Sequence, residues 1–89
     1  MTEKYVLADA DHDAERARLD LLEEAHDPIT RRRLSTLGVK PGSRCLEVGA
    51  GGGSIARWLG EQVTPSGAVV AVDINTRFLV DLPATVEVR

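Results

Sequence analysis

The stretch "RCLEVGAGGGSIARWLG", residues 44–60, decides the fold of this chain. It begins with a short apolar run, ends with apolar residues at helical spacing, and places a cluster of four glycines (49, 51, 52 and 53) between them. Glycine inside an ordered element costs about 0.5–1 kcal/mol relative to alanine, so the cluster indicates a backbone that another group approaches closely. The stretch therefore predicts a strand at 44–48, a glycine loop, and a helix at 54–63.

The residues that follow continue the alternation of strands and helices. "AVVAVD" (68–73) is apolar and rich in valine, which is typical of a strand buried on both faces of a parallel sheet. "TRFLVDL" (76–82) is compatible with a short helix before Pro83, and "TVEVR" (85–89) begins a third strand. The expected fold is therefore α/β, a Rossmann-like parallel sheet that is incomplete, with about three strands.

The residues before position 40 are dense in charge and spaced for helices. "DADHDAERARLDLLEEAH" (9–26) carries an apolar stripe at steps of three and four residues, formed by Ala14, Ala17, Leu21, Leu22 and Ala25. A second helix is expected to begin at Asp27 and Pro28 and to stop at Gly38, because proline suits the first helical position and glycine the position after the end. We expect residues 1–38 to form an N-terminal cap of two helices and residues 39–89 to form a separate unit.

The glycine loop and two carboxylates predict a binding site. A glycine loop between a strand and a helix exposes bare backbone and the unpaired N–H groups of the helix N-terminus. Glu47 lies near the end of the first strand, and Asp73 ends the second strand, 24 residues after Gly49. In open α/β sheets ligands bind beyond the carboxyl ends of the strands, and an acid at about this spacing accepts hydrogen bonds from both hydroxyls of a ribose.

Two patterns compete for the loop. The dinucleotide fingerprint G-x-G-x-x-G/A fits Gly51, Gly53 and Ala56, whereas acid-x-G-x-G-x-G is filled from Glu47 through Gly53. With the second pattern, "CLEVGAGGGSIARWL" followed by "VVAVDIN" resembles the first and second motifs of class I S-adenosylmethionine-dependent methyltransferases. The preceding "LGVKPGS" (37–43) is also similar to that family.

The resemblance implies a cofactor, S-adenosyl-L-methionine (SAM), its product S-adenosyl-L-homocysteine (SAH), and a set of contacts. Gly49, Ala50 and Gly51 would lie beneath the methionine and sugar parts of the cofactor, with Gly53 completing the loop pattern. Glu47 would hold the loop and help to bind the amino acid end, Asp73 would hold the ribose hydroxyls, and Ile74 would pack against the adenine. Residues 39–89 would then be the first half of a SAM-binding methyltransferase domain.

Several questions stay open at this point. Tyr5 could fold over the cofactor, and Arg18 could reach its carboxylate, although ordinary packing and surface charge explain both residues as well. No catalytic residue can be assigned. The alternatives are an NAD-binding oxidoreductase domain, which has the same topology with a different loop, and a non-catalytic SAM-binding module.

Composition limits the partners and the compartment. The net charge of −3 gives no electrostatic footprint for nucleic acid or an anionic membrane, so a small-molecule methyl acceptor is favoured over nucleic acid. Cys45 is the single cysteine, and the two histidines lack the spacing of a metal site, so no metal is expected. The N-terminal sequence is acidic and lacks a signal-peptide core, which makes a cytoplasmic location the expectation. The oligomeric state is not indicated.

Overall fold

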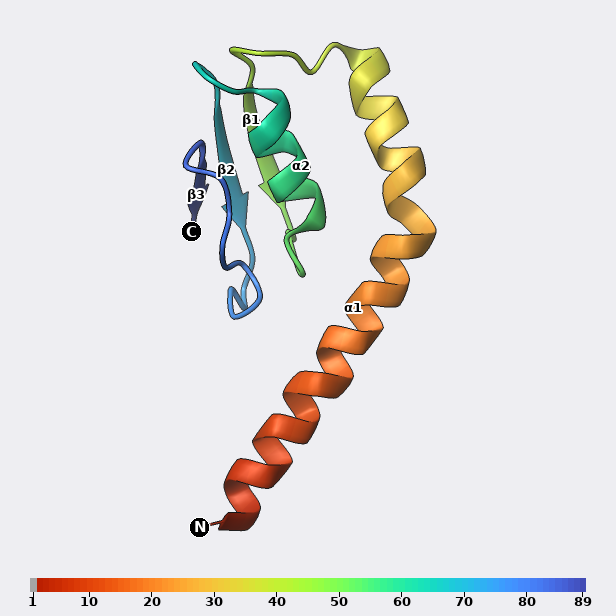
Figure 1. The fold of residues 1–89 in the computed structure, drawn as a ribbon, viewed down its shortest axis with the longest axis vertical. Helices are drawn as coiled ribbons and strands as arrows, with labels where there is room; N and C mark the ends of the chain where they lie inside the picture. The colour runs from red at the N-terminus through yellow and green to blue at the C-terminus, as the bar shows by residue number, and fades with distance from the viewer. Residues whose placement is uncertain (1) are drawn as a thin grey trace.

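The computed structural model describes residues 2–89, with side chains from residue 10 onward, as an α/β fold with a three-stranded parallel sheet (Figure 1). The elements of this part of the chain are, in order, α1 (Thr2–Leu37), β1 (Arg44–Val48), α2 (Ser54–Gln62), β2 (Ala68–Val72) and β3 (Val86–Val88). The strands lie in the order β1-β2-β3. The predicted α/β class and the three parallel strands are confirmed.

The core lies on the face of the sheet that α2 covers. Val63, at the C-terminal end of α2, and Val69 of β2 are almost fully buried, and they pack with Leu59. On this same face of β1, Cys45 packs against the cluster. The opposite face of β1 carries Leu46 and Val48, which are 67% and 76% exposed. The sheet is therefore covered on one side only in the described residues.

The two predicted N-terminal helices are one continuous helix, α1, with Pro28 inside it. Proline in a helix interior removes one backbone hydrogen bond and crowds the preceding turn, which is why a boundary was expected there. Tertiary contacts on both sides of Pro28 offset this cost, since Leu19 contacts the glycine loop and Leu34 packs against the α2 cluster. The predicted end is correct: α1 ends at Leu37, and Gly38 has a φ of 102°.

The helix considered for residues 76–82 is absent, and this segment forms turns. Asp73 Oδ1 accepts a hydrogen bond from the N–H of Asn75 (3.0 Å), and Asn75 Oδ1 accepts one from the N–H of Arg77 (3.1 Å). These side-chain acceptors bind the N–H groups at the start of the segment and hold the backbone in turns. Phe78 and Leu79 are nevertheless buried, so the segment covers one end of the core.

Four members of the apolar stripe predicted for residues 9–26 point away from the sheet, whereas Leu22 lies on the side of α1 that faces the glycine loop. All five of its members, Ala14, Ala17, Leu21, Leu22 and Ala25, are classed as exposed. The helix packs instead through a mixed face that includes Arg16, Leu19 and Leu34. Figure 1 shows α1 running beside α2 and continuing past the end of the sheet. Over residues 2–89, neither helix has the length and apolar character needed to cross a membrane.

Candidate ligand-binding site

The glycine loop, residues 49–53, is held by the end of β2. The N–H groups of Gly49 and Ala50 both donate to the carbonyl of Val72, at 2.7 and 3.0 Å. Gly49 and Gly51 have φ angles of 76° and 55°, in the left-handed region that side chains disfavour. These two positions therefore need glycine for conformation alone, before any ligand is considered.

Asp73 fixes the loop from the other strand. Its Oδ2 accepts a hydrogen bond from the N–H of Gly51 (2.8 Å), and its Oδ1 accepts one from Asn75. These hydrogen bonds from the N–H groups of Asn75 and then Gly51 lower the pKa of Asp73, because they stabilise the charged form. An ionised carboxylate has about four acceptor positions, so Asp73 can still accept hydrogen bonds from a ligand.

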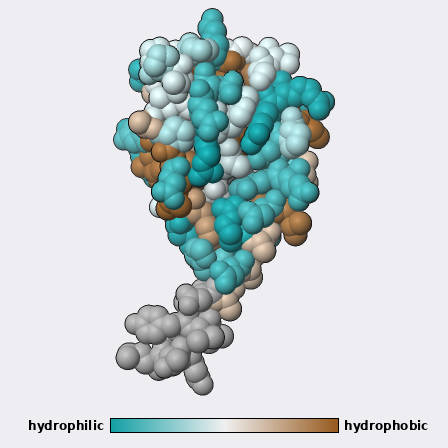
Figure 2. Space-filling view, in the orientation of Figure 1, coloured by the Kyte–Doolittle hydropathy of each residue, from teal (hydrophilic) through white to brown (hydrophobic). Residues whose placement is uncertain are grey.

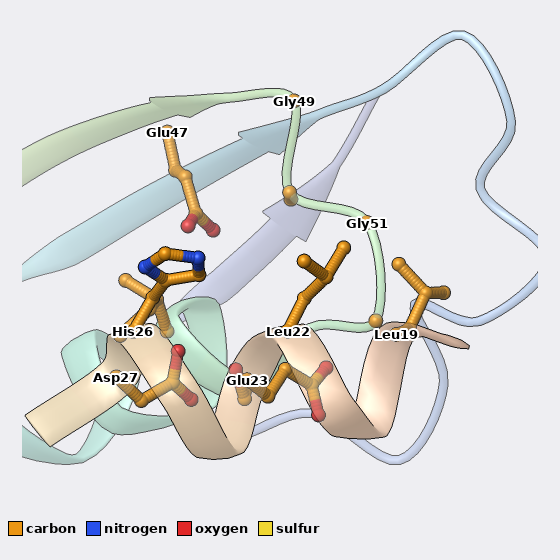
Figure 3. Close-up of a pocket in the computed structure, with 12 residues that line it drawn as sticks. Leu19, Leu22, Glu23, His26, Asp27, Glu47, Gly49 and Gly51 are labelled. Atoms are coloured by element: carbon orange, nitrogen blue, oxygen red, sulfur yellow. The ribbon is translucent and has the colours of Figure 1, made fainter. Parts of the chain in front are cut away.

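Two hollows lie on either side of Gly51. The first, of about 200 Å³, lies between α1 and the end of β1 (Figure 3). Its walls are Leu19, Leu22, Glu23, His26, Asp27, Glu47, Gly49, Ala50, Gly51, Gly52, Ser54 and Ile55. The second, of about 130 Å³, lies beside Asp73 and is lined by Glu15, Arg18, Leu19, Gly51, Asp73, Asn75 and Phe78.

Leu19 of α1 separates the two hollows. It lines both of them, and its Cδ2 atom is 3.5 Å from the position that a Cβ on Gly51 would occupy. In Figure 3 the side chain of Leu19 points from α1 toward the glycine loop. An extended ligand that reaches from Glu47 to Asp73 therefore requires this side chain to turn away from Gly51.

Glu47 points from β1 into the first hollow, toward His26 and Asp27 of α1 (Figure 3). Its Oε1 is buried and has no hydrogen-bond partner among the described residues. Burial, followed by the negative charges of Asp27 and Asp73, raises the pKa of Glu47 to about 7. The hollow therefore contains a polar atom that lacks a partner, at a position where a bound donor group would be stabilised.

The raised pKa of Glu47 predicts a pH-dependent effect of Glu47→Gln. The folded state holds the proton more tightly than the unfolded state, so the stability contributed by neutral Glu47 is fully present below pH 4.5 and is lost as pH rises toward 7. Glutamine stays neutral, so we expect the variant to be more stable than the parent by about 1–2 kcal/mol at pH 8, a value reduced for partial exposure. At pH 5 the two should be nearly equal.

Urea unfolding followed by circular dichroism at both pH values measures this difference. Glu61→Gln, at an exposed position of α2, is the matched control and should show the same small effect at both pH values. A Glu47→Gln effect that does not change between pH 5 and pH 8 would contradict the raised pKa.

An ion pair from α1 rests on Gly52. Both oxygens of Glu23 accept hydrogen bonds from Arg16 Nη2, at 2.9 and 3.0 Å, and Arg16 Nη1 donates to the carbonyl of Gly52 at 3.3 Å. A Cβ on Gly52 would overlap both side chains. The overlapping atoms are the ends of flexible side chains, so a residue with a Cβ at position 52 would displace this ion pair from the loop.

The structure brings most of the predicted residues together. Glu47, Gly49, Ala50 and Gly51 line the first hollow, and Asp73 lines the second. Gly53 lies on the core side of the loop, where a Cβ would be 3.2 Å from Leu79 Cδ2. Ile74 is fully exposed and lines neither hollow.

Arg18 and Tyr5 were the two N-terminal residues considered as cofactor contacts, and the structure describes the side chain of Arg18 only. Arg18 lines the hollow beside Asp73, but its guanidinium is paired with Glu15. The side chain of Tyr5 lies outside the described residues. The site contributions of Leu19, Glu23 and Asp27 were not predicted, because they depend on how α1 packs. The one available signal was the spacing of Arg16, Leu19, Glu23 and His26, which places them on one face of a helix.

Comparisons with models of protein families, with curated proteins and with solved structures find no match to this chain. The residues that bear on function are therefore those of the glycine loop and the two strand-end acids, together with the hollows that they line.

Proposed function

We propose that this chain is the cofactor-binding part of a SAM-dependent methyltransferase with a Rossmann-like sheet. The observation that carries the proposal is the arrangement of Glu47 and Asp73, which lie at the carboxyl ends of neighbouring parallel strands and line hollows on opposite sides of one bare glycine loop. This arrangement fits an elongated ligand with an amino acid at one end and a ribose near the other.

The first hollow suits the amino acid end of such a ligand. Glu23, Asp27 and Glu47 make it acidic, and the unpaired Oε1 of Glu47 would accept a hydrogen bond from an ammonium group. Ser54 and Ile55, in the first turn of α2, line the same hollow, and N–H groups at a helix N-terminus favour a carboxylate. Groups of both signs are thus present for a zwitterion.

The second hollow suits the ribose. The carboxylate of Asp73 can accept hydrogen bonds from two vicinal hydroxyls while Gly51 and Asn75 keep it in place. Leu19 would turn aside to let the ligand join the two hollows. Ile74, fully exposed beside this hollow, would be free to pack on an adenine ring.

When bound, the cofactor supplies an electrophilic methyl group on a sulfonium. The chain's own residues bind and orient the donor, and positioning provides much of the rate enhancement in such a transfer. No described residue is assigned as a catalytic base. We propose a small-molecule acceptor, in keeping with the net charge of −3, and a cytoplasmic location, in keeping with the single cysteine.

Titration calorimetry with SAH tests the proposal on the 89-residue chain and on Asp73→Ala. We expect the parent to bind SAH, and the variant to bind about tenfold to a hundredfold more weakly, as for hydrogen bonds to a charged group. Thermal unfolding of both proteins without ligand separates loss of affinity from loss of the Asp73–Gly51 hydrogen bond.

Glu87→Ala, an exposed acid of β3 remote from both hollows, is the matched control and should bind SAH like the parent. A parallel titration with NAD distinguishes a SAM-binding domain from the alternative, an NAD-binding oxidoreductase domain. Tight binding of NAD without binding of SAH would overturn the proposal, and equal SAH affinities of parent and Asp73→Ala would remove the ribose assignment.

A further inference from the structure

Glu47 lies in surroundings that disfavour its charged form. Hydrophilic side chains occupy much of the molecular surface seen in Figure 2, where solvent stabilises their charges. Glu47 instead points into the first hollow, and its Oε1 is buried without a hydrogen-bond partner among the described residues (Figure 3). A carboxylate at this position lacks the donors that would stabilise its charge. Its burial therefore favours the protonated, neutral form.

The carboxylates around Glu47 act in the same direction. Glu23 and Asp27 of α1 line the first hollow with side chains that are only 24% and 15% exposed. Asp73 adds a third negative charge from the end of β2. Burial, followed by the charges of Asp27 and Asp73, raises the pKa of Glu47 to about 7, so the acid changes its charge near neutral pH.

The positive side chains of α1 do not compensate for these charges. Arg16 is bound to Glu23, and Arg31 Nη2 lies 4.0 Å from Asp27. Neither arginine lines the first hollow, and no lysine lines it among the residues whose side chains are described. His26 is the other titratable group that faces Glu47, and it is exposed to solvent. Glu47 therefore has no fixed positive partner.

A positive group of a ligand would reverse this balance. An ammonium group beside Glu47 favours the carboxylate, so its arrival drives a proton off the acid. A neutral group or a ligand carboxylate in the same place would bury Glu47 further without a positive partner, and the acid would hold its proton more tightly. The direction of proton exchange on binding therefore reports the charge of the ligand group that enters the first hollow.

We propose that Glu47 releases its proton to solvent when the ammonium group of the ligand enters the first hollow, so that affinity for the ligand rises with pH. This inference rests on the proposed function, because the ammonium group is that of the cofactor's amino acid end. The neutral acid and the charged ligand become a carboxylate–ammonium pair and one free proton. Glu47 thereby selects ligands with an ammonium group, most strongly above pH 7.

The size of the effect follows from the pKa of Glu47. With a pKa of about 7, Glu47 is protonated in about nine of ten molecules at pH 6 and in about one of ten at pH 8. Binding of SAH should therefore release close to one proton per ligand at pH 6 and almost none at pH 8. Its affinity should be about tenfold higher at pH 8 than at pH 6.

Titration calorimetry of the 89-residue chain with SAH, in pairs of buffers that differ in ionisation enthalpy, measures the protons released. Glu47→Gln cannot ionise, so it should release none and lose the rise in affinity with pH. His26→Gln removes the other titratable side chain that faces Glu47 and should keep the proton release. Glu61→Gln, at an exposed position of α2, is the matched control and should behave like the parent.

Carbon NMR of the side-chain carboxyl groups gives a second readout that needs no variant. The resonance of Glu47 should move from its neutral to its ionised position when SAH is added to the parent at pH 6. Uptake of protons, or no exchange, by a parent that binds SAH would overturn this inference and leave the proposed function standing.

The variants separate the remaining outcomes. Proton release that persists in Glu47→Gln would overturn this inference, because another group, such as His26, would then be the source. Absence of SAH binding by the parent at both pH values would overturn the proposed function, and this inference with it.

Discussion

Gly67→Ala is expected to lower the free energy of unfolding by about 3 kcal/mol. A Cβ at this position would overlap the carbonyl oxygen of Ser43 and both the Cβ and the carbonyl oxygen of Val63. Val63 is fully buried, and the N–H of Ala68 donates to the Ser43 carbonyl at 3.1 Å. None of these groups can move without separating the starts of β1 and β2.

Urea unfolding at neutral pH measures the effect, with Gly38→Ala as control. Gly38 has open space around its Cβ position and a φ of 102°, so its replacement costs only backbone strain, about 1–2 kcal/mol. If Gly67→Ala destabilised the chain no more than Gly38→Ala, this result would contradict the close packing of Gly67 against Ser43 and Val63.

Gly51→Val is expected to reduce SAH affinity more than a hundredfold, beyond the range of most calorimetric titrations. A valine here would project toward Leu19, into the surface shared by the two hollows, where the proposed ligand lies on bare backbone. The φ of 55° also disfavours a β-branched residue, so some loss of stability accompanies the loss of binding.

Gly38→Val separates these two effects. It places the same side chain at another glycine of positive φ, in open space at the end of α1. This control should lose stability and keep its affinity for SAH. Retained binding in Gly51→Val would reject a ligand that lies against the glycine backbone.

The elements from β1 to β2 could be predicted because local patterns determine them. "RCLEV" and "AVVAV" are short apolar runs bounded by turn residues, and the glycine loop separates the first from an amphipathic helix. Their bounds in the structure, Arg44–Val48 and Ala68–Val72, agree with the prediction to within one residue. In each case the local preference and the tertiary packing favour the same conformation.

The errors occur where local and tertiary preferences differ. Pro28 predicts a helix boundary, but contacts of Leu19 and Leu34 on either side of it keep α1 continuous. The stripe around Leu21 was identified correctly as one face of a helix. A pattern of apolar residues does not specify what covers that face, and in this structure it is exposed.

The strand-end acids of the site could be predicted from the sequence, whereas the contacts that α1 and the glycine loop make there could not. Glu47 and Asp73 follow from a general rule, since the carboxyl ends of adjacent parallel strands meet at one edge of a sheet. The pairing of Asp73 with Gly51, and the placement of Leu19 and Glu23 over the loop, depend on long-range packing. No spacing within the sequence determines these contacts.

The position of Leu19 has a kinetic consequence. A ligand that spans the two hollows binds only the conformers in which this side chain has rotated away, and because rotamers interconvert in picoseconds to nanoseconds, the fraction of such conformers scales the association rate and the affinity alike. Replacing Leu19 with a smaller residue should then raise the association rate and the affinity by the same factor and leave the dissociation rate unchanged.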